Sequence, residues 1–384
     1  SFLEVKQKLT FMHIEAVNKR FQDFIEETEK KLDMVIPVEK CPSNADNRQA
    51  NISTILASGD KNIDLISVND EMISEFKHKG YLEPLEKNVM TEEVRDSFPQ
   101  KYLESICEEN GHIYSVPFQM DIMMFWVNQE LLKQAGLDEI KNTGDFDILQ
   151  KSLKNPDQYA YGDAWENTHV YNSLSQFVNF WGGDYFDWTD PKTKDAARYM
   201  KSMLDEKNTS PAQFVDQYEQ MEEKFIRGKY GCVFMYTSAL GTFLDADVYG
   251  KNKIHMAPLP VLHKKKATNI ATWQYVLNNA SENKDAAVRF LQYAAGYEGS
   301  TEYAKIMKSY PARVDVIENE DIDLEGIDMI RKYLREYTLN ARPLCENSMG
   351  AVSDMGKLFQ GYVLGQCEED SFFEQAQNCI NTYY

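Results

Sequence analysis

Residues 271–316, ATWQYVLNNASENKDAAVRFLQYAAGYEGSTEYAKIMKSYPARVDV, decide the fold of this 384-residue chain. Residues 273–277 are aromatic and β-branched and stop at two asparagines, which predicts a short strand. Asn283 is a suitable N-cap, and apolar residues then recur at i, i+3, i+4 and i+7, the pattern of one buried helical face. The residues of that face are Ala287, Phe290, Leu291 and Ala294. A shorter helix and an extended exit at residues 310–313 complete the segment.

Strands and helices alternate from the other end of the chain. Residues 9–12, 34–38 and 63–68 are expected strands, and residues 14–32 and 51–57 are the expected helices between them. This alternation predicts an α/β fold with a parallel sheet flanked by helices. Ligands of such sheets bind at the carboxyl ends of the strands. The polar residues expected at those ends are His13, Glu15, Asn69 and Asp70.

Composition restricts the classes of partner. The chain has 61 acidic and 41 basic side chains, a net charge of −20, which repels nucleic acid and anionic membrane surfaces. A hydrophobic content of 43% suffices for sizeable cores, and the length predicts two domains of roughly 100–200 residues. No run of eighteen apolar residues predicts a membrane span. No signal peptide opens the chain, which agrees with earlier removal of one before Ser1.

Motifs for catalysis or metal binding are missing from the sequence. There is no G-x-S-x-G, H-E-x-x-H or G-x-G-x-x-G pattern. The six cysteines are scattered without a C-x-x-C pair, so we expect mostly free thiols, although the even count also allows disulfides. We expect no metal and no cofactor. A glycoside hydrolase needs only two carboxylates, so a glycan-processing enzyme stays an alternative.

Several motifs carry a family resemblance. The segment 271–316 resembles the same region of family 1 extracellular solute-binding proteins of bacterial ABC importers, the maltose-binding-protein-like group. The matching motifs are N-x-x-A-A-x-x-F-L at 283–291, Y-A at 303–304, P-A-R at 311–313, L-A-S-G at 56–59, G-x-L-x-P-L at 80–85, G-x-x-Y-x-V-P at 111–117 with the later Asn128, L-L-K-x-A-G-L at 131–137, and A-P-L-P at 257–260. Two motifs are degraded: residues 141–147 lack the usual P-x-T-W, and a usual tryptophan is absent near Ser238, where Tyr236 would substitute.

The resemblance implies a two-lobed, type II periplasmic-binding-protein-like fold. Each lobe would be a mainly parallel sheet flanked by helices, with the ligand in the cleft between lobes. The N-terminal lobe would comprise residues 1–120 and 273–320, and the C-terminal lobe residues 121–272 and 321–384. The implied function is capture of a carbohydrate, an oligosaccharide in our interpretation, by hinge closure and its delivery to the permease, without catalysis.

The resemblance and the residue types together give a set of expected ligand contacts. These are His13, Glu15, Ser67, Asn69, Asp70, Asp121, Trp165, Tyr236, Trp273 and Arg313. The acids Glu15, Asp70 and Asp121 would accept hydrogen bonds from sugar hydroxyls. The aromatic residues Trp165, Tyr236 and Trp273 would stack on sugar rings, and Arg313 would donate hydrogen bonds to the sugar. Asp121 interrupts an apolar run, and its alternative role is a buried cap of backbone amides. The alternative role of Trp273 is that of a core residue, and the alternative role of Arg313 is a salt bridge at a hinge.

Partners and location follow from the same resemblance. We expect a monomer that binds a small carbohydrate and the permease subunits of an ABC transporter, and that binds no nucleic acid. It would lie outside the cell, in the periplasm or on the cell surface, with membrane attachment only through an N-terminal lipid anchor. Because several candidate contacts are acids, a polyamine or another cationic solute is the alternative ligand.

Overall fold

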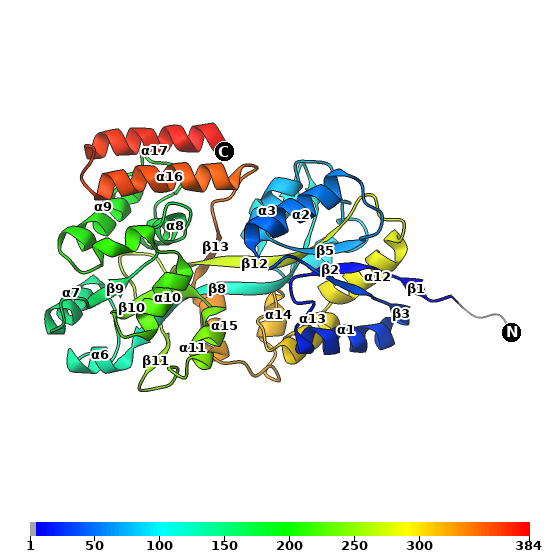
Figure 1. Ribbon diagram of the computed structural model, residues 1–384, viewed down its shortest axis with the longest axis horizontal. Coiled ribbons are helices and arrows are strands. Elements are labelled where there is room, and N and C mark those ends of the chain that lie inside the picture. Colours follow the sequence, from blue (N-terminus) through cyan, green and yellow to red (C-terminus); the bar gives the residue numbers. More distant parts are fainter. Residues whose placement is uncertain (1–4) are drawn as a thin grey trace. The chain divides into compact units, whose positions relative to one another are not determined.

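The computed structural model describes residues 5–384 and divides into two compact units (Figure 1). Unit 1 consists of Ser1–Met120 and Ala271–Leu334, and unit 2 of Asp121–Ile270 and Arg335–Tyr384. Both are mixed α/β units, as the sequence predicts. Among the described residues, no helix is long and apolar enough to cross a membrane.

The last boundary between the units lies later in the chain than expected. The expected position is after residue 320, but unit 1 continues to Leu334, inside helix α15 (Ile327–Glu336). Arg331 explains the difference, because its side chain donates to the carbonyls of Ile317 (2.8 Å) and Asn319 (2.8 Å) and so ties α15 to unit 1. The boundary that we expected after residue 272 lies slightly earlier in the chain, after Ile270.

The sheet of unit 1 has the strand order β4-β2-β5-β12. Strands β4 (Val38–Lys40), β2 (Phe11–His13) and β5 (Leu65–Asn69) are parallel to one another. Strand β12 (Ala267–Leu277) pairs antiparallel with β5, so that Leu277 lies opposite Leu65. The amino-terminal end of the unit 1 part of β12 therefore lies beside the carboxyl end of β5, and the carboxyl end of β2 lies on the other side of β5.

Short strands and ten helical segments complete unit 1 in the described residues. The strands are β1 (Gln7–Lys8), β3 (Met34–Val35), β6 (Glu108–Glu109) and β7 (His112–Ile113). The helical segments are α1 (Lys19–Leu32), α2 (Ala45–Ala57), α3 (Asp70–Phe76), α4 (Glu92–Arg95), α5 (Gln100–Tyr102), the π-helix η1 (Leu103–Cys107), α12 (Lys284–Ala295), α13 (Tyr297–Met307), α14 (Val314–Ile317) and α15. In Figure 1, α2 and α3 lie on one side of this sheet and α1 and α13 on the other.

An aromatic cluster forms the core of unit 1. Phe11 packs edge-on against Tyr275 and Phe290, with ring centroids 5.1 Å apart in both pairs. Phe118 stacks on Tyr275 at 3.9 Å. The expected apolar face of residues 287–294 is buried, as predicted, and Phe290 carries it into this cluster.

The strands of unit 2 run in both directions. Strand β8 (Val116–Asn128), which enters from unit 1, is antiparallel to both β10 (Tyr230–Tyr236) and β11 (Ile254–Ala257). Strand β10 is parallel to β9 (Tyr159–Gly162), and β13 (Thr338–Ala341) is parallel to the start of β12. The expected mainly parallel order is therefore limited in this unit to the pairs β9–β10 and β12–β13.

Helices surround the core of unit 2. They are α6 (Gln129–Gln134), α7 (Thr143–Ser152), α8 (Val170–Trp181), α9 (Pro191–Asp205), the 3₁₀-helix η2 (Pro211–Val215), α10 (Tyr218–Ile226), α11 (Ala239–Asp245), α16 (Ser348–Val363) and α17 (Glu369–Tyr383). Helices α8, α9 and α16 pack on one another, and α17 covers α16 (Figure 1). Phe234 of β10 lies in the core against Phe125, Phe177 and Phe180.

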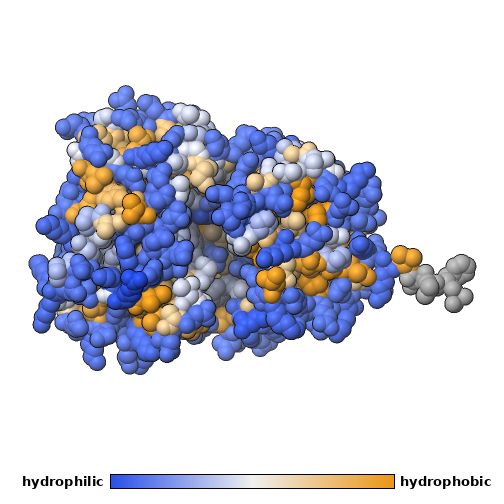
Figure 2. All heavy atoms as spheres, in the orientation of Figure 1, coloured by the Kyte–Doolittle hydropathy of each residue, from blue (hydrophilic) through white to orange (hydrophobic). Residues whose placement is uncertain are grey.

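The surface is hydrophilic, and the cysteines are free thiols, as expected from the sequence. The visible surface of each unit is mostly hydrophilic, with scattered hydrophobic residues (Figure 2). All six cysteines are free thiols in the structure, and four of them are buried. Burial raises the pKa of the Cys107 thiol to about 12, so this thiol stays protonated and unreactive at neutral pH.

Candidate functional site

One edge of the unit 1 sheet collects most of the expected contacts of that unit. Trp273 of β12 lies opposite Asn69 of β5. The amide of Ile14, directly after β2, donates to Ser67 Oγ at 2.9 Å. His13, Glu15 and Asp70 adjoin these residues in the chain, so the carboxyl ends of β2 and β5 bring them to one edge, as predicted from the strand order.

His13 is at this edge but belongs to the core. Its ring is fully buried, stacks on Phe21 at 3.8 Å and lies 5.3 Å from both Phe11 and Phe118. Nδ1 accepts a hydrogen bond from the amide of Glu15 at 3.0 Å. Burial lowers the pKa of His13 well below the usual value for histidine, so the ring is neutral at physiological pH. We therefore replace the expected ligand contact by a structural role.

Acidic pH should destabilise the fold through His13. The unfolded chain takes up a proton at this residue below about pH 6.5, whereas the buried ring does not, so the free energy of unfolding falls as pH falls through that range. We expect His13→Phe to remove about 1 kcal/mol of the stability difference between pH 7.5 and pH 5.5. Urea unfolding of both proteins at the two pH values measures it. Equal pH dependence in both would contradict the assignment.

The other polar residues of the edge differ in availability. Asn69 caps helix α3, because its Oδ1 accepts from the amide of Met72 at 2.9 Å. Asp70 and Ser67 are fully buried. Glu15 is half-buried and accepts from Asn18 Nδ2 at 2.9 Å. Glu15, Asn69 and Trp273 are the expected contacts of this edge that keep part of their surface exposed.

Sequence reasoning missed Arg48 at the same edge. Its guanidinium carbon lies 5.4 Å from the centre of the Trp273 ring, a cation–π stack. Arg48 belongs to helix α2, which Asn44 caps through the amide of Asn47 (3.0 Å) and which begins before the expected residues 51–57. The stretch between Asn44 and the expected start is polar and lacks helical periodicity, so only the cap could have revealed the longer helix.

Arg313 is tied up in structural contacts. Its guanidinium donates to both carboxylate oxygens of Asp315 (2.9 and 2.7 Å), to the carbonyl of Ala295 (2.9 Å) and to Ser97 Oγ (3.0 Å). These partners include none of the edge residues. Arg313 therefore fastens the start of α14 to unit 1 in place of the expected ligand contact.

In unit 2, the structure brings Asp121 and Tyr236 close together. Thr237, the residue after Tyr236, donates from Oγ1 to the Asp121 carboxylate at 3.2 Å. The Tyr236 hydroxyl donates to Asn172 Oδ1 at 2.9 Å. Asp121 is half-buried, whereas Tyr236 is 6% exposed. The two expected contacts of this region therefore share one end of the β8–β10 pair.

Arg342 is a second residue that the sequence analysis missed. Its guanidinium carbon lies 5.8 Å from the ring of Tyr171 and 6.0 Å from that of Tyr236, and Nη1 donates to the Tyr171 hydroxyl at 2.8 Å. Tyr218 packs edge-on against Tyr236 at 6.2 Å. Arg342 directly follows β13, a strand that sequence reasoning did not identify.

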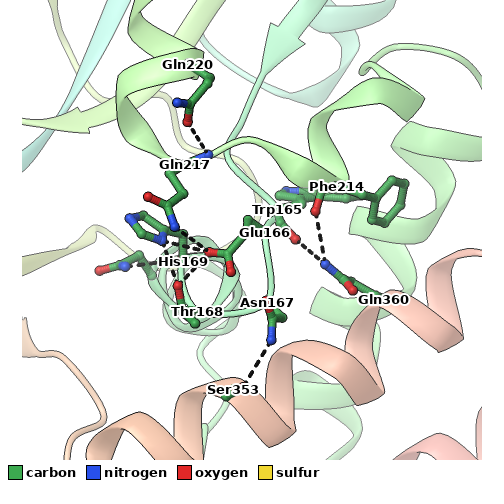
Figure 3. A network of polar contacts seen from close by, with 11 residues as sticks. Trp165, Glu166, Asn167, Thr168, His169, Phe214, Gln217, Gln220, Ser353 and Gln360 are labelled. Atoms are coloured by element: carbon green, nitrogen blue, oxygen red, sulfur yellow. Dashed lines mark hydrogen bonds and ion pairs between the residues drawn. The ribbon is translucent and has the colours of Figure 1, made fainter. Parts of the chain in front are cut away.

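Trp165 is a core residue and does not offer a stacking face. Its ring is fully buried between Phe214 (5.6 Å) and Phe359 (5.4 Å). Its carbonyl accepts from Gln360 Nε2 of α16 at 2.7 Å, and Gln360 also bonds the carbonyl of Phe214 (Figure 3). Trp165 therefore anchors the loop that leads into α8.

The rest of that loop forms a polar network (Figure 3). The Glu166 carboxylate accepts from Thr168 Oγ1 (2.5 Å), His169 Nδ1 (3.0 Å) and Gln217 Nε2 (3.4 Å). Burial alone raises the pKa of Glu166, but the hydrogen bonds from Thr168 and His169 outweigh it and leave the pKa below its usual value. The network links the loop to Gln217, the residue directly before α10. No group of three potential ligands within residues 5–384 could hold a metal ion.

Comparisons with known proteins give the family. The model of the bacterial extracellular solute-binding proteins matches residues 17–301. A probable amino-acid ABC transporter periplasmic-binding protein, y4oP of Sinorhizobium fredii, is 24% identical over 239 residues, which are 59% of this chain and 54% of that protein. The chain thus matches about half the length of this curated relative.

Solved structures share the whole fold. A solute-binding protein of Thermotoga lettingae bound to α-D-tagatose has a TM-score of 0.79 at 18% identity, with 99% of each chain covered. The sugar-binding protein MalE of Xanthomonas citri has a TM-score of 0.80 at 16% identity, with 98% of this chain and 96% of that chain covered. At this level of identity the likeness concerns the fold alone. With the family match over most of its length, the chain belongs to the bacterial extracellular solute-binding proteins.

Proposed function

We propose that this protein captures a carbohydrate outside the cell and passes it to the permease of an ABC importer. The observation that carries the proposal is the unit 1 edge, where half-buried Trp273 lies opposite Asn69 at the carboxyl end of β5, next to the strand β2 that ends at the same edge. Indole faces stack on the C–H faces of sugar rings, and amide and carboxylate groups bind sugar hydroxyls. Glu15 and Asn69 supply such groups in unit 1.

Unit 2 offers the same combination of residue types. Asp121 is half-buried at one end of the β8–β10 pair, and Tyr236 and Arg342 lie near one another there. Solved proteins of similar fold are bound to maltose, tagatose or mannitol, which supports a sugar as the solute. The proposed mechanism is binding-coupled closure, in which the segments that pass from one unit to the other serve as hinges.

The proposal includes binding without chemistry. Family members are solute-binding proteins, and the candidate acids serve as hydrogen-bond acceptors: Glu15 accepts from Asn18 and Asp121 from Thr237. We therefore assign each of these carboxylates the role of accepting hydrogen bonds from sugar hydroxyls, and not that of a general acid in catalysis. A monomer held outside the cell, in the periplasm or through a lipid anchor, completes the proposal.

A thermal-shift screen tests the proposal. Monosaccharides, oligosaccharides, amino acids and polyamines are added separately, and a solute at 100 times its dissociation constant should stabilise the protein by about 2.7 kcal/mol. We expect a raised melting temperature with one class of carbohydrate and recovery of that carbohydrate intact. Shifts with amino acids alone would favour the chemistry named for y4oP, and shifts with polyamines alone the cationic alternative. Cleavage of the carbohydrate would overturn the assignment as a binding protein.

A further inference from the structure

Arg48 is an unusual residue at the proposed solute edge. It is 7% exposed, and its guanidinium covers one face of the Trp273 ring at 5.4 Å. Among the described residues its one hydrogen bond runs from Nη1 to the carbonyl of Ser43 at 3.2 Å. Burial lowers the pKa of Arg48, against smaller opposite effects of Cys41 and Glu71, and the ion pairs of the described residues include none to Arg48. A buried positive charge thus has one neutral partner.

The Nε side of the guanidinium is the part that could bind a ligand. Arg48 Nε is buried and has no hydrogen-bond partner in the structure. A buried charged donor without a partner is costly, and a guanidinium N–H pair matches the two oxygens of a planar carboxylate. The guanidinium lies over the ring of Trp273, and half-buried Trp273 keeps part of its surface exposed.

We propose that Arg48 binds a carboxylate of the solute through its Nε edge while Trp273 stacks on the solute ring. The solute would then be a carbohydrate that carries an acid group, such as a uronic acid or an oligosaccharide of uronic acids. This inference rests on the proposed function for the carbohydrate part. The carboxylate part depends only on Arg48.

Two further observations favour an acidic solute over a cationic one. Glu15, the half-buried acid of the same edge, already accepts from Asn18 Nδ2, whereas Arg48 Nε has no partner. In unit 2, the guanidinium of Arg342 likewise lies over the ring of Tyr236, with its Nη1 donating to the Tyr171 hydroxyl. Each unit therefore places an arginine on the aromatic residue predicted to stack on the solute.

Titration calorimetry with paired ligands tests the inference. Galacturonic and glucuronic acids are compared with galactose and glucose, di-galacturonate with maltose, and glutamate serves as a carboxylate that is not a sugar. We expect the acidic sugar to bind roughly tenfold or more tightly than its neutral partner. The methyl ester of galacturonic acid, which lacks the charge, should lose that advantage in the unmodified protein.

The variant Arg48→Lys separates carboxylate binding from packing. Lysine keeps the charge and a cation–π contact but lacks the two-pronged N–H edge, so affinity for the acidic sugar should fall roughly tenfold. Arg289→Lys is the matched control, because Arg289 lies in the same unit but makes exposed hydrogen bonds to Gln7 Oε1 and the Leu32 carbonyl, neither of which is a residue of the solute edge. The control should retain the affinity of the unmodified protein, and melting without ligand shows whether either variant is folded.

The outcomes separate the inference from the proposed function. Equal affinity for acidic and neutral sugars, with the ester unimpaired, would overturn the role of Arg48 and leave the carbohydrate function standing. Binding of glutamate alone, lost in Arg48→Lys, would support the carboxylate contact and overturn the carbohydrate function. If Arg48→Lys fails to fold, the comparison of acid with ester in the unmodified protein decides the question.

Discussion

Gly356→Ala is expected to lower the free energy of unfolding by about 2–3 kcal/mol. A Cβ at this position of helix α16 would lie 2.0 Å from the carbonyl oxygen of Asn167 and 2.7 Å from its carbonyl carbon. These are backbone atoms of the loop that includes Trp165 and Glu166, so they can move only if the helix or the loop shifts. Urea unfolding with a linear extrapolation measures the loss.

Gly361→Ala in the same helix is the matched control. A Cβ there would meet only the end of the Gln366 side chain, at 3.7 Å. Because alanine favours the helix, this variant should gain about 0.5–1 kcal/mol. Two variants of equal stability would show that the close approach of Asn167 to α16 is wrong.

Asp64→Ala is the second change with a large expected effect, a loss of about 3 kcal/mol. Asp64 is 1% exposed, and its carboxylate accepts from the Thr10 amide (2.8 Å), Ser281 Oγ (2.6 Å) and Asn283 Nδ2 (3.3 Å). The substitution removes the acceptor from three donors in two segments far apart in the chain, Thr10 and residues 281–283. Denaturant unfolding of the variant gives the loss.

Asp60→Ala controls for the loss of a carboxylate in the same turn region. Among the described residues the Asp60 carboxylate accepts one hydrogen bond, from the amide of Asn62 at 2.9 Å, and this bond is exposed to solvent, so its loss should cost less than about 1 kcal/mol. If Asp64→Ala costs no more than Asp60→Ala, the Asp64 carboxylate does not join those two segments in the folded protein.

Local sequence patterns predicted the elements that have strong local signals. The expected strand over residues 63–68 is found as β5, shifted to Leu65–Asn69, residues 273–277 lie in strand β12 as expected, and Phe290 lies on a buried helical face. The expected strand over residues 34–38 is two strands, β3 and β4, because Pro37 between them cannot donate to a ladder. Strand β13 was missed, since its short polar sequence becomes a strand only by pairing with β12.

The candidate site was harder to predict than the fold. Residue type marked Trp165 and Arg313 as ligand contacts, but their burial depends on partners remote in the chain, such as Phe359 for Trp165 and Ser97 for Arg313. Arg48 and Arg342 carry no local signal either. Their meaning comes from the aromatic rings on which they lie, Trp273 and Tyr236, and no spacing in the sequence reports those pairs.

The interleaving of the two units has a consequence for synthesis and for proteolysis. During synthesis, more than 200 residues are added after β5 before its partner strand β12 is made. The sheet of unit 1 therefore cannot be completed until late in translation. Unit 1 lacks a segment until Leu334 has been added, and unit 2 lacks one until α17 is complete. By the same logic, a single peptide-bond cleavage anywhere from residue 121 to residue 334 leaves no fragment with all the segments of either unit. A protein nicked there would stay active only while its fragments remained associated.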